Sequence, residues 1–210
     1  MTAGSSRTRS ASESTPAEEL GSSAQRDRRK RILDATLALG SKGGYDAVQM
    51  RAVAERADVA LGTLYRYFPS KIHLLVSAMA RELEKVRERT ERVTIPGDNA
   101  YERLMFILTR ITKGMQRDPN LAEAMTRAFM FADASAAAEV DAVGQLTDRM
   151  IARALNDGDP TEEQLAIARV ISDVWLSNLV AWVTRRASAT DVAQRLELTI
   201  ALLLGEKSVA

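Results

Sequence analysis

Apolar residues recur at helical spacing along most of the chain after residue 24. In the stretch 71–92, Ile72, Leu75, Met79 and Leu83 lie three or four residues apart, which is the period of one face of an α-helix. Similar stripes predict further helices at 26–41, 100–117, 120–131, 133–155, 159–186 and 189–203. Glycines and prolines separate these stretches, as expected at helix ends. The pattern predicts an all-α fold.

Two shorter helical segments lie between the first stripe and the long one. The sequence QMRAVAERADVALGTLYRYFPSK predicts helices at 50–57 and 61–68, joined by a tight turn. Small side chains at Ala54 and Ala57 allow the two helices to cross closely, and Val59 is the apolar residue that such a turn places between them. This is the pattern of a helix-turn-helix, whose second helix enters the major groove of DNA.

These patterns divide the chain into three parts. Residues 1–23 are rich in Ser, Thr, Ala and Glu and lack apolar periodicity, which predicts a disordered tail. Residues 24–70 are expected to form a three-helix DNA-binding domain that contains the helix-turn-helix. Residues 71–210 are expected to form a helical bundle that binds a ligand and dimerises. The prediction is about nine helices in total.

The last two predicted helices carry more apolar surface than one core needs. In the stretch 159–186, Leu165 and Trp175 mark one apolar stripe, while Ile167 and Ile171 mark another. Apolar residues on more than one face indicate burial on more than one side. Two such helices at the end of the chain predict a homodimer joined through a four-helix interface.

Composition argues against an enzyme, a cofactor site and a metal site. The chain has no cysteine, and its only histidine is His73, so neither a thiolate nucleophile nor a histidine cluster is available. No metal-ligand cluster or glycine-rich phosphate loop is visible. No apolar run of about 18 residues and no secretory signal is visible either, which predicts a cytoplasmic protein without a membrane partner.

The net charge of +1 conceals an asymmetry along the chain. Residues 24–71 hold ten Lys or Arg against five Asp or Glu, whereas residues 72–210 hold 17 against 20. A basic run that includes Arg26, Arg28 and Arg29 directly precedes the helix-turn-helix, where it is expected to contact DNA phosphates. Solvated surface charge is the plain alternative for such a run.

The segment LGTLYRYFPSK, after a helix of the form R-x-V-A-x-x-A, closely resembles the TetR family of bacterial transcriptional regulators. The resemblance covers roughly residues 25–75 in detail. Asp58 stands where glycine is frequent in that family, and Asp tolerates the left-handed conformation that the turn requires. Ala60 and Leu61 replace polar residues that often precede the Gly-Thr pair, so sequence preference is least predictable there.

The resemblance implies roles for individual side chains in DNA binding. Residues placed toward base edges are Arg51, Leu61, Gly62, Thr63 and Tyr65. Residues placed toward phosphates are Tyr67, Lys71, Arg26, Arg28 and Arg29. The chemistry agrees, because arginine presents a planar fork to guanine, while lysine and tyrosine suit phosphate oxygens. Leu64 and Phe68 are expected to be core residues.

The middle helices are expected to surround an apolar effector. The candidate lining residues are Met105, Phe106, Leu108, Met115, Met125, Phe129, Met130, Leu146, Met150, Trp175 and Leu179. Five of them are methionines, which adapt to large and irregular ligands. Ordinary core packing is the alternative for each residue taken alone.

Segments such as EAMTRAFMFADASAA and RVISDVWLSNLVAWVTRRASATDV resemble the branch of the family that represses sterol-catabolism genes. That resemblance implies a palindromic operator and a steroid acyl-CoA thioester as effector. Basic candidates for the CoA end are Arg110, Arg127, Arg169, Arg185 and Arg186. Alternatives are a regulator of efflux or other metabolism with a different apolar ligand, an activator, a DNA binder without a ligand, and a helical dimer on a membrane surface.

Overall fold

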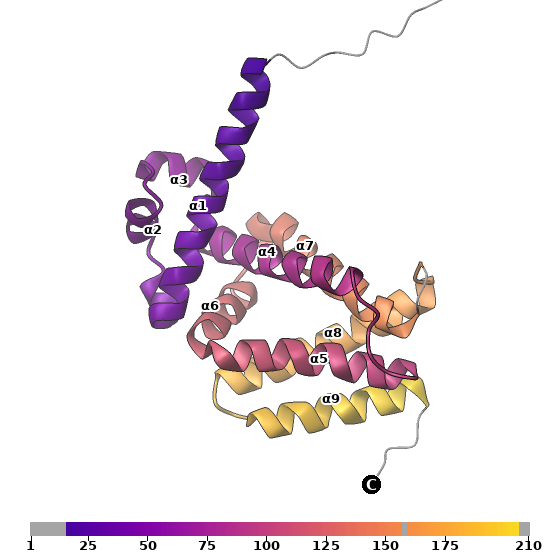
Figure 1. Ribbon diagram of the computed structural model, residues 1–210. Helices are drawn as coiled ribbons and strands as arrows, with labels where there is room; N and C mark the ends of the chain where they lie inside the picture. The colour runs from indigo at the N-terminus through magenta and orange to yellow at the C-terminus, as the bar shows by residue number, and fades with distance from the viewer. Residues whose placement is uncertain (1–15, 157–158, 206–210) are drawn as a thin grey trace, which may run out of the picture.

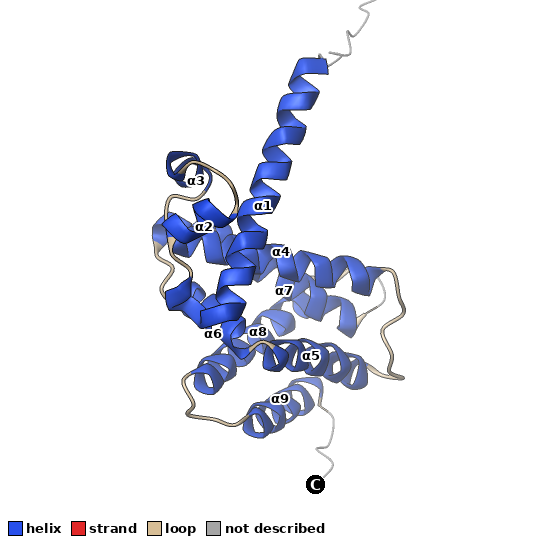
Figure 2. Ribbon diagram, turned by 60° about the vertical axis from the view of Figure 1, so that its left-hand side comes forward, coloured by secondary structure: helices blue, strands red, loops and turns tan. Residues whose placement is uncertain are grey.

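The computed structural model describes residues 16–156 and 159–205, and within these ranges the chain is entirely helical apart from turns and connections. The elements are α1 (Pro16–Ala47), α2 (Met50–Arg56), α3 (Leu61–Tyr67), α4 (Lys71–Glu91), α5 (Ala100–Arg117), α6 (Pro119–Met130), the 3-10 turn η1 (Ala134–Ala136), α7 (Ala137–Leu155), α8 (Glu162–Val183) and α9 (Ala189–Leu204). Figures 1 and 2 show their arrangement. The all-α prediction is confirmed.

Helices α1 to α3 form a small head at one end of the molecule (Figure 1). Ile32 of α1, Val53 of α2 and Leu64 of α3 are fully buried, and Phe68 directly after α3 is 2% exposed. These side chains form the core that holds the two short helices on α1. Helices of seven residues are marginal alone, so their stability comes from this packing. The core roles predicted for Leu64 and Phe68 are confirmed.

Helix α1 begins earlier than the sequence suggests, and its helical path breaks at the predicted glycines, Gly43 and Gly44. Residues 16–23 belong to α1, so the predicted tail extends too far into the chain; residues 1–15 lie outside the described residues. Gly44 has φ 66°, in the left-handed region that favours glycine. A Cβ there would lie 3.0 Å from Glu123 Oε2. The helical path therefore breaks at this glycine, and the chain turns toward α2.

The turn between α2 and α3 has the predicted form. Asp58 adopts φ 52°, the left-handed conformation expected where related sequences often carry glycine. The Val59 amide donates to the Ala54 carbonyl at 3.0 Å, and the Val59 side chain packs against the core. This geometry fixes the crossing of the two short helices.

Helices α4 to α9 form the bundle, and most of them begin at a side-chain cap. Ser70 caps α4, and Ser188 and Asp191 form a reciprocal capping box on α9, which satisfies amides of the first turn. The predicted start of α8 is wrong. Thr161 rather than Asp159 is the cap, because Thr161 and Gln164 bond to each other's backbone amides at 3.2 and 2.9 Å.

Two other helix boundaries differ from the sequence prediction. The stretch 133–155 divides into η1, capped by the Asp133 side chain, and α7. Helix α8 ends at Val183 instead of 186, and Arg185 after it has φ 60°. A left-handed residue cannot continue an α-helix, so the chain turns there toward α9.

Helix α8 is long and apolar enough to cross a membrane by length and composition alone. Its sequence contains no unbroken apolar run of that length, because polar and charged residues interrupt the apolar ones. Only 28% of its most apolar window is buried within this chain. Ile171, Trp175 and Leu179 are buried in the bundle, while Val170 on another side is 46% exposed. The helix thus has one apolar side packed in the core and another that a second subunit could cover.

Candidate nucleic-acid interface and ligand cavity

Helix α3 separates into a buried side and an exposed side. Leu64 points into the core, whereas Leu61 and Tyr65 are 37% and 46% exposed. Gly62 is exposed, and a Cβ added there would meet nothing within 4 Å. Thr63 is half-buried. Figure 2 shows α3 at the outer edge of the molecule, where a groove of DNA can approach its exposed side.

Positive charge lies next to this exposed side. Arg51, in the first turn of α2, is exposed, as is Arg66 on α3. Arg66 is absent from the predicted set, although its place in the same motif, one residue after Tyr65, could have indicated it. Tyr67 is half-buried, with its ring 6.4 Å from that of Phe68. The exposed side of α3 and the start of α2 therefore present polar and basic groups to a common direction of approach.

The basic residues before the helix-turn-helix belong to α1 and not to a flexible arm. Arg26 and Arg29 are exposed and Arg28 is half-buried. The Arg29 guanidinium lies 5.5 Å from the centre of the Phe68 ring, which ties one of these charges to the head core. The three side chains therefore project from one regular helix.

Lys71 lies at the junction of head and bundle. Its ammonium is 3.7 Å from the centre of the Tyr45 ring, a favourable cation–π distance. Burial lowers the pKa of Lys71, and the opposite charge of Asp46 acts in the other direction. The side chain thus has a packing role in addition to the predicted phosphate role.

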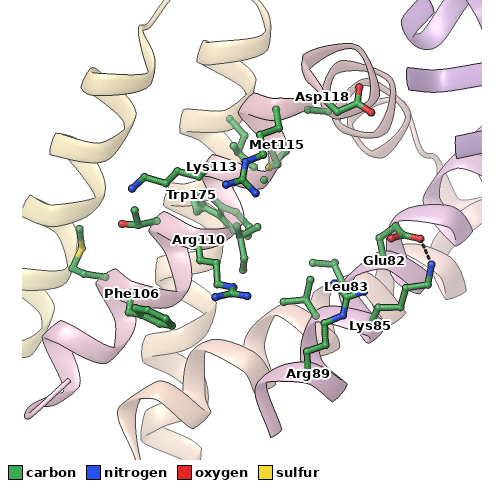
Figure 3. Close-up of a pocket in the computed structure, with 18 of the residues that line it drawn as sticks. Glu82, Leu83, Lys85, Arg89, Phe106, Arg110, Lys113, Met115, Asp118 and Trp175 are labelled. Carbon is green, nitrogen blue, oxygen red and sulfur yellow. Dashed lines mark hydrogen bonds and ion pairs between the residues drawn. The ribbon is translucent and has the colours of Figure 1, made fainter. Parts of the chain in front are cut away.

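A cavity of about 1170 Å³ opens between α4, α5, α6 and α8, and Glu197 of α9 also lines it. Its volume lies slightly above the range typical for small-molecule sites. Six of the predicted residues line it: Met105, Phe106, Met115, Met125, Trp175 and Leu179. Figure 3 shows Phe106, Met115 and Trp175 among the lining side chains. The middle helices therefore do enclose a partly apolar space.

The other five predicted residues do not line this cavity. Leu108 and Met150 are buried in the core between helices, and Phe129 and Leu146 pack against that core. Met130, at the end of α6, is 47% exposed and faces outward. Helical periodicity alone cannot distinguish a core face from a cavity face, because both require apolar residues.

Cations lie on two walls of the cavity. Among the described residues, Arg89, Arg110, Lys113 and Arg117 are exposed lining residues without an ion-pair partner. Figure 3 shows Arg89 from α4 and Arg110 from α5 on either side of the space. Of the basic candidates from sequence, only Arg110 lines the cavity. Arg127 stacks on Tyr45, and Arg169 binds Asp148 at 2.7 Å.

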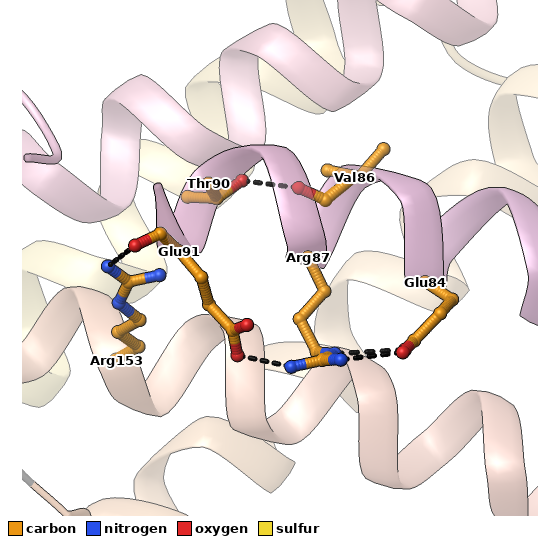
Figure 4. Close-up of polar contacts among 6 residues, drawn as sticks. All are labelled: Glu84, Val86, Arg87, Thr90, Glu91 and Arg153. Atoms are coloured by element: carbon orange, nitrogen blue, oxygen red, sulfur yellow. Dashed lines mark hydrogen bonds and ion pairs between the residues drawn. The ribbon is translucent and has the colours of Figure 1, made fainter. Parts of the chain in front are cut away.

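The charged half of α4 has two different sides. Lys85, which binds Glu82 at 2.8 Å, and Arg89 face the cavity. On the other side Arg87 pairs with Glu84 and Glu91 (Figure 4). Arg153 of α7 donates to the Glu91 carbonyl.

Hydrogen bonds join the cavity wall to the head. Asp118, a lining residue between α5 and α6, accepts from the Ser41 hydroxyl at 2.5 Å and from the Leu121 amide at 3.0 Å. Glu123 accepts from the Tyr45 amide at 2.9 Å. Ser41 and Tyr45 lie at the end of α1, the helix on which α2 and α3 pack. A displacement of α6 would therefore act directly on the head.

His73 makes a connection within the bundle, at the end of α4 next to the head. Its Nδ1 lies 2.9 Å from the Ser70 hydroxyl, and its Nε2 lies 3.0 Å from the Ser135 carbonyl in η1. A carbonyl only accepts, so Nε2 carries a proton. The only histidine thus fixes the start of α4 against the connection between α6 and α7.

Comparison with known proteins agrees with this geometry. Residues 32–78 match the bacterial regulatory proteins of the tetR family, and residues 97–203 match the tetracyclin repressor-like C-terminal domain. The chain is 73% identical to the HTH-type transcriptional repressor KstR of Rhodococcus jostii over 191 residues, which cover 91% of this chain and 89% of that protein.

Solved structures show the same fold. A TetR regulator from a Rhodococcus species superposes with a TM-score of 0.77 at 31% identity, over 89% of this chain and 99% of that one. The repressor FadR of Thermus thermophilus, solved in complex with lauroyl-CoA, gives 0.67 at 24% identity, over 87% and 96%. With its helix-turn-helix head, cavity-containing bundle and these relatives, the chain belongs to the TetR family of bacterial transcriptional regulators.

Proposed function

We propose that this protein is a cytoplasmic repressor of sterol or lipid catabolism genes that leaves its operator when a steroid acyl-CoA binds. The observation that carries the proposal is the cavity, which combines apolar walls with unpaired cations. An apolar body fits beside Met105, Met125 and Leu179, while phosphates of CoA suit Arg89 and Arg110 through charge-assisted hydrogen bonds. The high identity to a KstR repressor supports the same assignment.

The proposed DNA contacts comprise base contacts from Arg51 and α3 and phosphate contacts from α1, Tyr67 and Lys71. One subunit presents one α3. A two-fold dimer presents two, which would enter successive major grooves roughly 34–36 Å apart on a palindromic site. Repression then requires that the free dimer hold this spacing.

The proposed dimer forms through α8 and α9. Leu198 and Leu202 of α9 are 51% and 72% exposed, and Val170 of α8 is 46% exposed. These apolar side chains lie on the second face of each helix, away from the bundle core. Leu202→Glu is expected to give monomers in sedimentation velocity experiments. A dimer of unchanged stability would contradict this interface.

To release the repressor from DNA, the ligand must bind the arrangement that cannot fit the operator more tightly than the arrangement that can. In the proposed mechanism the ligand contacts α4, α5 and the corner at Asp118. Through α4 and through the bond between Asp118 and Ser41, it changes the angle between bundle and head. The spacing of the two reading helices then no longer matches the operator.

The test is a binding titration with DNA from upstream of the protein's own gene. Fluorescence anisotropy should show specific binding, and 5β-cholanoyl-CoA should release the DNA while free CoA and free 5β-cholanoic acid do not. If an acyl-CoA without a steroid also released the DNA, the effector would belong to the acyl-CoA class in general and not to steroid acyl-CoAs. Tight thioester binding with unchanged DNA affinity would refute the mechanism, and stronger DNA binding or transcription with the thioester would indicate an activator.

A further inference from the structure

A row of alternating charges connects the cavity to helix α1. In the cavity wall, the Lys85 ammonium lies 2.8 Å from Glu82 Oε1 (Figure 3). The same carboxylate oxygen lies 3.6 Å from Nε of Arg81. On its other side, Arg81 pairs through Nη2 with Asp34 Oδ1 at 2.8 Å and donates through Nη1 to the Lys30 carbonyl at 3.3 Å. One acid of the cavity wall is thus shared between a cavity cation and the arginine that holds α4 against α1.

The two ends of this row differ in how easily they separate. Lys85 and Glu82 have side chains that are 43% and 37% exposed, and they stand three residues apart on one helix. Exposed pairs of this kind are weak. The Arg81 side chain is only 16% exposed, so its contacts with α1 lie in a more shielded environment, where charges interact more strongly. An anionic group that enters the cavity can therefore detach Lys85 from Glu82 at little cost.

The contacts of Arg81 hold α1 at a place separate from the contacts at its end. Lys30 and Asp34 lie about two helical turns before Ser41 and Tyr45, which bond to the α6 region. Attachments at two places along one helix fix its angle to the bundle. If the attachment through Arg81 loosens, α1 can tilt about its contact with α6 and carry α2 and α3 with it.

We propose that Lys85 binds an anionic group of the cavity ligand and that its transfer from Glu82 to the ligand loosens the hold of Arg81 on α1. Once Lys85 faces the ligand, the Glu82 carboxylate keeps Arg81 as its nearest cation and competes with Asp34 for it. The negative charge of the ligand repels Glu82 in the same direction. The anion is a phosphate of an acyl-CoA only if the proposed function holds, whereas the competition for Arg81 does not depend on that identity.

Lys85→Met tests the competition without any ligand, because it takes the cation away from Glu82 as the ligand would. Operator binding, followed by fluorescence anisotropy, should weaken by roughly fivefold, which is the most that one exposed ion pair supports. Addition of Glu82→Gln should restore the affinity, because a neutral amide no longer competes for Arg81. The matched control is Arg87→Met, which removes another paired cation of α4 on the side of α7 (Figure 4) and should leave operator binding unchanged.

The position of the head can also be measured without DNA. The chain has no cysteine, so Glu55→Cys in α2 and Gln145→Cys in α7 place two spin labels on exposed positions of head and bundle. Double electron–electron resonance, on labelled protein diluted with unlabelled protein, should show a shifted distance distribution in Lys85→Met and the parental one when Glu82→Gln is added. An unchanged distribution in Lys85→Met, or a shift that persists in the double variant, would overturn the proposal.

Ligand titrations separate this inference from the proposed function. 5β-Cholanoyl-CoA should still bind Lys85→Met through its apolar body and the remaining cations. The factor by which it weakens operator binding should be roughly fivefold smaller than in the parent protein, because part of the change has already occurred. An unreduced factor would contradict the role of Lys85. If the thioester does not bind at all, the effector class fails, and the ligand-free variants still decide the inference.

Discussion

The head and the bundle are built from the same kind of element but packed in opposite ways. In the head, seven-residue helices pack on fully buried side chains such as Val53 and Leu64. In the bundle, helices of 12 to 22 residues leave a cavity of about 1170 Å³ between them. Close packing holds side chains in one arrangement, which suits a surface that must match DNA. A bundle with internal space can have more than one arrangement, which suits a sensor.

The two regions meet where α1 packs along α6, the most extensive contact between two helices among the described residues, and polar contacts around the end of α1 add to it. Ser41 and Tyr45 bond to Asp118 and Glu123, and the Tyr45 ring also lies beneath Lys71. The rigid region is thus attached to the adaptable one at the edge of the cavity. The following experiments test this contrast, beginning with the largest expected effect.

Replacement of phenylalanine by alanine should destabilise the head far more than the bundle. Phe68→Ala removes a 2% exposed side chain from the head core and should lower the free energy of unfolding by about 3–5 kcal/mol. Phe106→Ala removes a 39% exposed cavity residue and should change it by only about 0.5 kcal/mol. Urea unfolding followed by circular dichroism measures both. Equal losses would show that the bundle is packed as tightly around Phe106 as the head is around Phe68.

A matched pair of arginine variants should separate DNA binding from ligand binding. Arg51→Ala is expected to weaken binding to the operator by about 1–3 kcal/mol, with little change on random DNA, because it removes a base contact. Arg110→Ala should leave operator affinity unchanged and weaken binding of the acyl-CoA. Anisotropy with operator and scrambled DNA measures the first effect, and calorimetry measures the second. If Arg51→Ala weakens both DNAs equally, its assignment to bases is wrong.

Ser41→Ala should weaken communication between the two regions. The variant removes the bond from α1 to Asp118 but leaves that carboxylate as the cap of α6. The coupling free energy, measured as the change in operator affinity on adding 5β-cholanoyl-CoA, should fall by about 0.5–1.5 kcal/mol. Thr94→Ala, which removes an exposed hydroxyl before α5, is the control. Unchanged coupling in Ser41→Ala would exclude this contact from the route.

Lys71→Met should have the smallest effect, which should be visible mainly in how the DNA-binding constant depends on salt concentration. A cation–π contact with Tyr45 leaves ammonium hydrogens on the far side free for a phosphate. Loss of one such contact should flatten the slope of log K against log salt by roughly 0.9 per subunit. Lys113→Met in the cavity should not change the slope. A reduced stability with an unaltered slope would mean that Lys71 only packs.

The helix-turn-helix was predictable because its determinants lie close together in the sequence. Leu64 and Phe68 are apolar residues that were expected in the core and are buried, the family resemblance implied that Tyr65 faces outward, and Asp58 takes the backbone conformation that a turn at that position demands. Gly44 breaks the first helical path for a similarly local reason. Local sterics and the helical repeat, together with the family motif, account for these features.

The cavity was only partly predictable, because its walls come from five helices spread between residues 71 and 204. Amphipathic patterns show which face of a helix is apolar but not whether that face meets another helix or an open space. For this reason Leu108 and Met150 were expected in the cavity but lie in the core.

The sequence by itself therefore determined the helical elements, the reading helix and the surplus apolar faces of the last two helices. The tertiary structure alone decided which side chains share the cavity and which polar groups connect it to the head. These features depend on how helices distant in sequence pack against one another, and no local property of the chain specifies that packing.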